Sequence, residues 1–248
     1  MSLLEASILI AAGLFAGFIN TVAGGGSLLT MPLLIFMGLP SAEANASNRV
    51  AIFLQNVFSV VGFKSKGVSA FPFALWLAIS ASAGAFLGSR IAVDIEDLIF
   101  NRILAVVMLV VIGLIVFKPK IKEQVDEMMS MKKTWVSIVV FFFIGIYGGF
   151  IQAGVGFLVI AALTGAHGFN MAKTNSIKVF IIMCYTVIAL VIFWMEGKIK
   201  WEYGLVLAIG NSAGAWVASR WSVGKSDQLI KKILVVMVVG LSIKLWFF

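Results

Sequence analysis

The chain has 248 residues, of which 61% are hydrophobic and only 12% are charged, whereas a soluble domain typically has about a quarter of its residues charged. Its mean hydropathy is +1.08, so most of its exterior must face something other than water. The formal charge of +8 does not indicate a nucleic-acid partner, because the cations lie in short loops between apolar stretches, as in membrane proteins. Composition therefore excludes a soluble domain and predicts a lipid bilayer as the surrounding partner.

Three long runs contain no Asp, Glu, Lys or Arg, namely residues 6–42, 67–89 and 134–172. A helix needs about 20 mostly apolar residues to cross a bilayer. The first and third runs are long enough for more than one crossing or re-entrant piece. The start of the chain also lacks the basic region of a cleavable signal peptide. These runs predict an all-α polytopic membrane protein.

The expected elements form two similar sets. A glycine-broken unit at residues 4–37 precedes three long helices at 44–63, 69–91 and 98–117. A second broken unit at 134–165 precedes helices at 171–194, 202–221 and 227–247. We therefore divide the chain into a first transmembrane repeat (1–117), a charged cytoplasmic linker (118–133) and a second transmembrane repeat (134–248).

A sequence repeat supports this division. Residues 78–93 match residues 208–223 at nine of sixteen positions with a fixed offset of 130, including Ser-Ala-Gly-Ala followed by Ser-Arg. Apolar sequence of low complexity rarely matches by chance at such a combination. The beginnings of the halves also correspond, with small gaps: Asn20 with Gln152, Asn48 with Asn175, and Arg49 with Lys178.

The loops predict the orientation, because cytoplasmic loops of membrane proteins carry an excess of Lys and Arg. With the linker inside, 11 of these residues fall inside and 4 outside. Repeat-equivalent loops then lie on opposite faces, so we expect inverted repeats, with both termini outside. Each broken unit must enter and return as a helical hairpin. Parallel repeats would place the loop from Arg220 to Lys232 outside, against the charge rule.

The glycine clusters Gly24-Gly25-Gly26 and Gly154-Val155-Gly156 are candidate helix breaks. Matched glycine interruptions in inverted repeats are the best sequence indication of a transporter's binding site. A helix that restarts at Ser27 exposes backbone N–H groups, which attract an anion together with the helix dipole. Glycines can instead serve close helix packing, but three in succession weaken the helix that must pack.

Polar residues adjoin both clusters. Their amides could line one polar chamber or only join helices, and the two cations could attract an anion or extend to the membrane interface. The candidate substrate-binding residues are Asn20, Gly24, Gly25, Gly26, Ser27, Ser47, Asn48, Arg49, Gln152, Gly154, Gly156, Thr174, Asn175 and Lys178.

No catalytic or metal-binding motif stands out. The lone Cys184 excludes an intramolecular disulfide and a Cys-based metal cluster. His167, the only histidine, is expected at the surface or the membrane interface. Glu43 could carry a coupling proton or be a solvated loop acid. We therefore expect no enzymatic activity, no cofactor and no bound metal.

The chain resembles the sulfite exporter TauE/SafE family, also called the TSUP transporters. The resemblance rests on GFINTVAGGGS at 17–27, ANASNRVA at 44–51, the segment 148–156 and Lys-Thr-Asn at 173–175. It implies a secondary transporter of the bacterial inner membrane for sulfite, sulfonates or sulfoacetate. The second glycine cluster departs from the first by its Val155, which implies a looser anion cradle there.

Two other functions stay open from the sequence: an anion channel, and a membrane-embedded subunit without its own transport activity. The identity of the anion, the direction of transport, the coupling ion (proton or sodium) and the oligomeric state are not determined by the residues.

Overall fold

The computed structural model describes residues 1–69, 71–116 and 131–223, and the regular structure of these residues is entirely helical. The helices are α1 (Leu3–Val22), α2 (Ser27–Phe36), α3 (Ser41–Lys64), α4 (Phe73–Val93), α5 (Asp97–Val116), α6 (Met131–Phe150), α7 (Val155–His167), α8 (Met171–Met195) and α9 (Trp201–Trp221). The predicted helix at 227–247 and linker residues 118–130 lie outside the described residues. The helix predicted at 69–91 begins later, at Phe73, directly after Pro72.

Four helices in the described part of the chain are long and apolar enough to cross a membrane: Leu3–Val22, Phe73–Val93, Lys133–Phe150 and Met171–Met195. Large apolar side chains point outward from them, with Trp76, Phe143 and Trp194 exposed by 59%, 63% and 63%. A surface of this kind fits lipid and not water. The predicted all-α polytopic membrane protein is confirmed.

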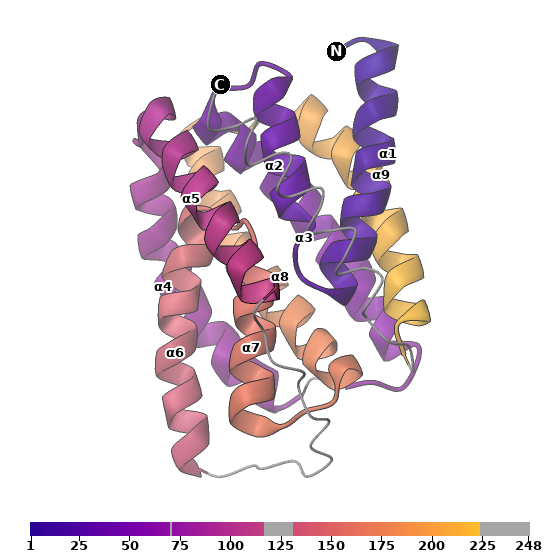
Figure 1. Cartoon of the computed structure of the whole chain (residues 1–248), viewed down its shortest axis with the longest axis vertical. Helices are drawn as coiled ribbons and strands as arrows, with labels where there is room; N and C mark the ends of the chain where they lie inside the picture. The colour runs from indigo at the N-terminus through magenta and orange to yellow at the C-terminus, as the bar shows by residue number, and fades with distance from the viewer. Residues whose placement is uncertain (70, 117–130, 224–248) are drawn as a thin grey trace.

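Each predicted broken unit consists of a long helix, a four-residue break and a shorter helix. The breaks are residues 23–26, between α1 and α2, and residues 151–154, between α6 and α7. Figure 1 shows α2 turning back toward the end of the molecule where α1 begins, and α7 turning back toward the start of α6. The predicted breaks are therefore present, and each unit is a hairpin.

Contacts between helix ends define the two ends of the molecule. At one end Lys200, before α9, pairs with Glu43 in the first turn of α3 at 3.4 Å. Glu196, after α8, pairs with Arg90 near the end of α4 at 3.6 Å. Only three residues separate Glu196 from Lys200, so both ion pairs lie at this same end. Thus α3 and α8 run in opposite directions, and so do α4 and α9. That the two helices of each pair are equivalent members of an inverted repeat stays a prediction.

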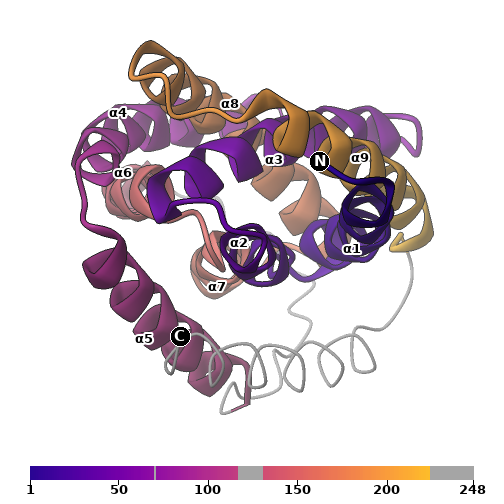
Figure 2. The same cartoon turned by 90° about the horizontal axis from the view of Figure 1, so that it is seen from above.

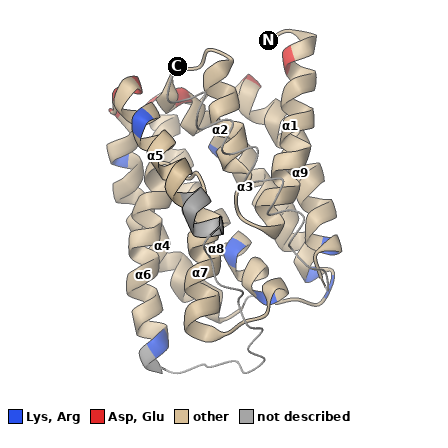
Figure 3. Ribbon diagram, in the orientation of Figure 1, with Lys and Arg blue, Asp and Glu red and all other residues tan. Residues whose placement is uncertain are grey.

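The opposite end gathers the other termini of these helices. Arg220 in the last turn of α9 donates from Nε to Ser65 Oγ, after α3, at 3.3 Å. Among the described residues, Figure 3 shows the acidic ones at the upper end of the molecule, and Lys and Arg without acidic residues at the lower end. This charge asymmetry agrees in direction with the orientation predicted from the loops.

Helices of one half pack closely on helices of the other. A Cβ atom at Gly17 of α1 would lie 2.1 Å from the Asn211 carbonyl oxygen of α9, and one at Gly149 of α6 would lie 2.3 Å from the Ala85 oxygen of α4. The backbones of these pairs are therefore in direct contact. Figure 2 shows α2 and α7 lying between the α1–α9 pair and the α4–α6 pair. The two breaks are thereby brought to the interior.

His167 lies in the core, so the expected surface position is wrong. Its side chain is 0% exposed, and Ser137 Oγ of α6 lies 2.8 Å from its Nε2. Phe73 and Phe169 pack against the ring. The physical reason is the return of α7 along α6, which places the last residue of α7 beside the first turns of α6.

Candidate functional site

The two matched glycine clusters, at which the helices break, meet. A Cβ atom at Gly24 would lie 2.5 Å from the Gly156 Cα, and one at Gly156 would lie 2.3 Å from the Gly24 Cα. Gly24 also has a φ of +90°, which L side chains rarely adopt. Ser27 Oγ links the breaks, since it donates to the Gln152 carbonyl at 3.3 Å and accepts from the Gly154 N–H at 3.4 Å. Only glycine permits this approach.

Both breaks are enclosed by protein. All residues from 23 to 26 and from 151 to 154 are buried, and Asn20 and Ser27 are exposed by only 5% and 3%. Irregular backbone at membrane depth is tolerated only where protein or a cavity satisfies it. Anything bound at these breaks would be sealed from both faces of the molecule.

The C-terminal end of α1 is capped by two side chains of α8. An α-helix leaves its last four carbonyl groups without partners in the helix. Lys178 Nζ donates to the Asn20 and Thr21 carbonyls at 3.0 and 2.9 Å, and Asn175 Nδ2 donates to the Val22 carbonyl at 3.0 Å. The remaining carbonyl accepts backbone N–H groups of the break. All four are therefore satisfied.

The C-terminal end of α6 is capped in the same way by α3. Arg49 donates from Nη1 to the Gly148 carbonyl at 2.9 Å and from Nη2 to the Gly149 carbonyl at 2.6 Å. Asn45 Nδ2 donates to the Phe150 carbonyl at 2.7 Å. The remaining carbonyl again accepts a backbone N–H group. A buried cation and an amide thus hold each broken helix from the opposite half of the chain.

The two cations do not extend to the membrane interface. Arg49 is 0% exposed and Lys178 is 1% exposed. Besides the two carbonyls, Arg49 Nη1 lies 3.5 Å from Gln152 Oε1, and its guanidinium lies 5.1 Å from the centre of the Phe193 ring. Within the described ranges no carboxylate forms an ion pair with Arg49. Its charge is therefore buried among neutral groups.

Several hydrogen-bond donors beside the breaks have no partner in the described part of the structure. They are Asn48 Nδ2, Arg49 Nε and the Tyr185 hydroxyl. Asn48 uses only its Oδ1, which accepts from Thr30 Oγ1 of α2 at 2.7 Å. Buried donors normally find acceptors. An unpaired Nε on the buried cation itself and the Tyr185 hydroxyl near it favour a ligand with more than one acceptor atom and a negative charge.

Other predicted site residues have structural contacts instead. Ser47 Oγ of α3 accepts from the Lys200 N–H at 2.9 Å, so Ser47 contacts the residue that precedes α9. Thr174 Oγ1, in the first turn of α8, donates to the carbonyl of Phe169, which precedes that helix, at 3.3 Å. Neither contact is with a break. Gly26 immediately precedes α2, and a Cβ atom there would lie 2.1 Å from the Ala16 carbonyl oxygen; Gly25 lies beside it in the first break.

The amide residues that match in sequence are not the ones that make equivalent contacts in the structure. Asn20 lies in the last turn of α1, whereas Gln152 lies inside the second break with a φ of +66°, so the two do not occupy corresponding places. By contacts the counterpart of Asn175 is Asn45, which the sequence analysis missed. Asn45 lies four residues before Arg49 and so shares its helix face. That spacing could have revealed it.

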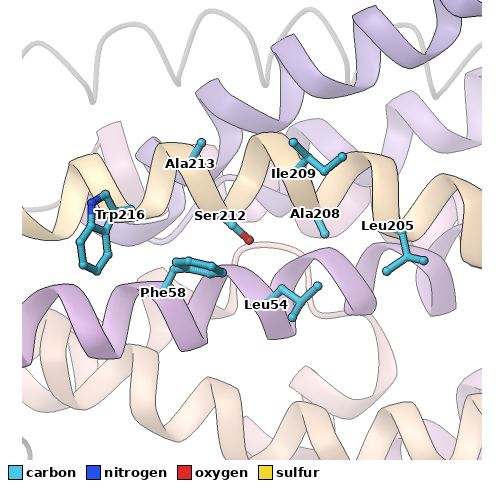
Figure 4. Close-up of a pocket in the computed structure, with 8 residues that line it drawn as sticks. All are labelled: Leu54, Phe58, Leu205, Ala208, Ile209, Ser212, Ala213 and Trp216. Carbon is cyan, nitrogen blue, oxygen red and sulfur yellow. The ribbon is translucent and has the colours of Figure 1, made fainter.

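An apolar groove elsewhere in the described part of the chain fits an anion less well than the breaks do. This groove, of about 620 Å³, lies between α3 and α9, and Figure 4 shows the side chains that line it. Ser212 is the one polar residue of its lining: Leu54, Phe58, Leu205, Ala208, Ile209, Ser212, Ala213 and Trp216. No group of three or more His, Cys, Asp or Glu side chains in the described ranges could hold a metal ion. The breaks, with two buried cations and unpaired donors beside them, are therefore a better candidate for an anion site than this groove.

Known proteins resemble the whole chain. A family model described as "Sulfite exporter TauE/SafE" matches residues 9–245. "Probable membrane transporter protein ORF9" of Sinorhizobium sp is 26% identical over 96% of this chain and 91% of its own length. "Probable membrane transporter protein YfcA" of Escherichia coli K12 is 27% identical over 96% of this chain and 88% of its own length. No solved structure matches the chain.

Proposed function

The chain belongs to the sulfite exporter TauE/SafE family, and on that premise we propose that it is a secondary transporter of a small oxyanion. The anion is sulfite, a sulfonate or a compound of the sulfoacetate type. It crosses the bacterial inner membrane by alternating access, and it binds beside the two helix breaks.

The observation that carries this proposal is the buried charge of Arg49. A guanidinium stays protonated in proteins, and burying a charge without an opposite one costs several kcal/mol. Arg49 is 0% exposed, and its recorded hydrogen bonds go to two backbone carbonyls and one amide oxygen. A bound anion would supply the missing opposite charge. The unpartnered donors Asn48 Nδ2 and Arg49 Nε would bind its oxygens.

Enclosure of the breaks favours a carrier over an open channel. A channel needs a continuous path for ions, whereas the residues of both breaks are buried. An anion can reach Arg49 only if a hairpin, α1–α2 or α6–α7, moves relative to α3 and α8. The opposite directions of α3 and α8 fit such movement, because rocking of one repeat against the other opens the site to alternate faces.

The chemistry of the donor set favours a sulfur oxyanion or a carboxylate. The donors suit an anion with paired oxygen atoms, because Arg49 contributes its positive charge and Nε while its Nη1 and Nη2 hold backbone carbonyls, and the neighbouring donors add single hydrogen bonds. Sulfite, sulfonate and carboxylate all present such oxygens. The family description, sulfite exporter, favours the sulfur compounds among them.

Counterflow in proteoliposomes tests this proposal. Purified protein is reconstituted into vesicles loaded with unlabelled sulfite, and radiolabelled sulfite is added outside at a low concentration. A carrier should accumulate label transiently, and the initial rate should saturate with sulfite concentration. Vesicles loaded with unlabelled sulfoacetate and with acetate compare the competing anions. Flux that neither saturates nor shows counterflow would indicate a channel, and no flux with any of the three anions would indicate a subunit without its own transport activity.

A further inference from the structure

Tyr185 carries a buried hydroxyl that the capping contacts do not use. Its side chain is 0% exposed, in the middle of α8. The hydroxyl makes no hydrogen bond of normal geometry to any described group, and the polar side chain of Gln152 lies near it in a contact that does not reach that geometry. Leaving a buried hydroxyl unpaired costs free energy that a phenylalanine at the same place would avoid. Such a group needs a reason for its presence.

The Tyr185 hydroxyl lies near Arg49, at the C-terminal end of α6. A Cβ atom at Gly148 would lie 2.9 Å from the Tyr185 hydroxyl oxygen, so the phenol end packs against Gly148. The carbonyl of that residue accepts from Arg49 Nη1. Tyr185 is also close enough to Arg49 for electrostatic interaction, and it lies close to the Gln152 side chain. The hydroxyl is therefore beside both the buried cation and the second break.

Two neighbouring residues of α3, in the first half, show the same feature. Gln55 and Asn56 lie on α3, as Tyr185 and Thr186 lie on α8. All four side chains are at most 1% exposed, and each has one polar atom without a partner in the described structure: Gln55 Nε2, Asn56 Oδ1, Tyr185 Oη and Thr186 Oγ1. Unpaired polar atoms on two adjacent buried residues of each helix are hard to attribute to accidental packing.

We propose that the Tyr185 hydroxyl is a specificity-determining hydrogen-bond donor of the anion site, where it binds an oxygen of the oxyanion that Arg49 holds. The inference rests on the proposed function and extends it to a residue outside the glycine clusters and the amides. A neutral hydroxyl completes the donor set without adding charge. Arg49 Nε and Tyr185 then supply two donors from two helices, α3 and α8. The ligand class is an anion with at least two acceptor oxygens.

The test is sulfite binding by the purified full-length Tyr185→Phe variant, measured by isothermal titration calorimetry. The substitution removes one oxygen atom and retains the ring. Loss of a hydrogen bond to a charged ligand should weaken sulfite binding by about ten- to a hundredfold. The apparent melting temperature without sulfite should stay the same or rise, because an unpaired buried hydroxyl has been removed. Tyr203→Phe is the matched control, since Tyr203 is only partly buried on α9 and should bind sulfite as the wild type does.

The outcomes separate this inference from the proposed function. If Tyr185→Phe binds sulfite with wild-type affinity while Arg49→Gln does not bind, the role of Tyr185 is wrong and the proposed function stands. The same conclusion follows if Tyr185→Phe lowers the melting temperature and leaves the affinity unchanged, as a purely structural hydroxyl would. If the wild type binds none of sulfite, sulfoacetate and methanesulfonate, the proposed function itself fails.

Discussion

Arg49 and Lys178 make corresponding contacts in opposite halves of the chain, since each donates two hydrogen bonds to carbonyls at the end of a broken helix of the other half. Arg49 on α3 holds α6, and Lys178 on α8 holds α1. The helix dipole places partial negative charge at each of these ends, which favours a cation there. The two cations therefore fix the ends of the helices at the breaks.

Lys178→Met should destabilise the protein. The change leaves the Asn20 and Thr21 carbonyls and Asn175 Oδ1 without the Nζ donor, and each buried acceptor left unpaired costs about 1–3 kcal/mol. Removal of the buried charge offsets part of this cost. We expect a clearly lower apparent melting temperature in detergent.

Lys66→Met is the control for this change, because Lys66 is exposed in the loop after α3 and should leave the melting temperature unaltered. Equal melting temperatures for Lys178→Met and the wild type would contradict the capping role of Lys178.

Gly156→Ala should prevent the two breaks from meeting. The added methyl group would lie 2.3 Å from the Gly24 Cα, and backbone on both sides leaves no flexible side chain to move. Overpacking of this kind typically costs about 1–3 kcal/mol. We expect reduced yield of monodisperse protein and slower sulfite uptake by reconstituted vesicles.

Gly165→Ala lies on the same helix, α7, and no atom lies within 4 Å of its added Cβ. It should behave as the wild type or be slightly more stable, because Ala favours helix more than Gly does. Wild-type yield and uptake for Gly156→Ala would disprove the tight contact between the breaks.

Asn48→Ala should mainly weaken sulfite binding, whereas Asn175→Ala should mainly lower stability. Asn48 Nδ2 has no partner in the described structure, so its removal should weaken sulfite binding by about ten- to a hundredfold. Both amide groups of Asn175 are used, by the Val22 carbonyl and by Lys178, so Asn175→Ala should mainly lower the melting temperature. Calorimetry and thermal unfolding on the same preparations compare the two. A larger loss of affinity in Asn175→Ala at unchanged stability would reverse the assignment.

The broken hairpins were predictable from local chemistry. Charge-free runs longer than one span, each interrupted by glycines, require a helix that enters and returns, and the breaks lie at residues 23–26 and 151–154. Arg49 and Lys178 were also identifiable, because a cation within an apolar helix is costly and needs a role.

The partners of these residues were not predictable. Which carbonyls Arg49 and Lys178 contact depends on packing between the halves, with contacts such as Gly17 on Asn211 that no local pattern encodes. For the same reason Asn45 and Tyr185 were missed, while Ser47 and Thr174 were included although they bind elsewhere. Sequence similarity between the halves paired Asn20 with Gln152, but Asn20 lies in α1 and Gln152 lies in the second break, and the repeat itself stays a prediction.

Cysteine labelling should place the two ends of the molecule on opposite sides of the membrane. Ser2 and Ser65 are exposed, and Ser65 lies at the end that carries Arg220. In a Cys184→Ser background, an impermeant maleimide added to intact spheroplasts should label Ser2→Cys, and it should label Ser65→Cys only after permeabilisation. Labelling of both positions from the same side would contradict the predicted orientation.

The most direct test of the central claim is the affinity of purified Arg49→Gln for sulfite, compared with the wild type by isothermal titration calorimetry on monodisperse preparations. The substitution removes the charge and retains a hydrogen-bonding side chain. If an anion neutralises Arg49 in the buried site, the wild type should bind sulfite and Arg49→Gln should bind it at least about a hundredfold more weakly. Arg90→Gln, which changes an exposed arginine paired with Glu196, should bind as the wild type does. Equal sulfite affinity for Arg49→Gln and the wild type would contradict the account.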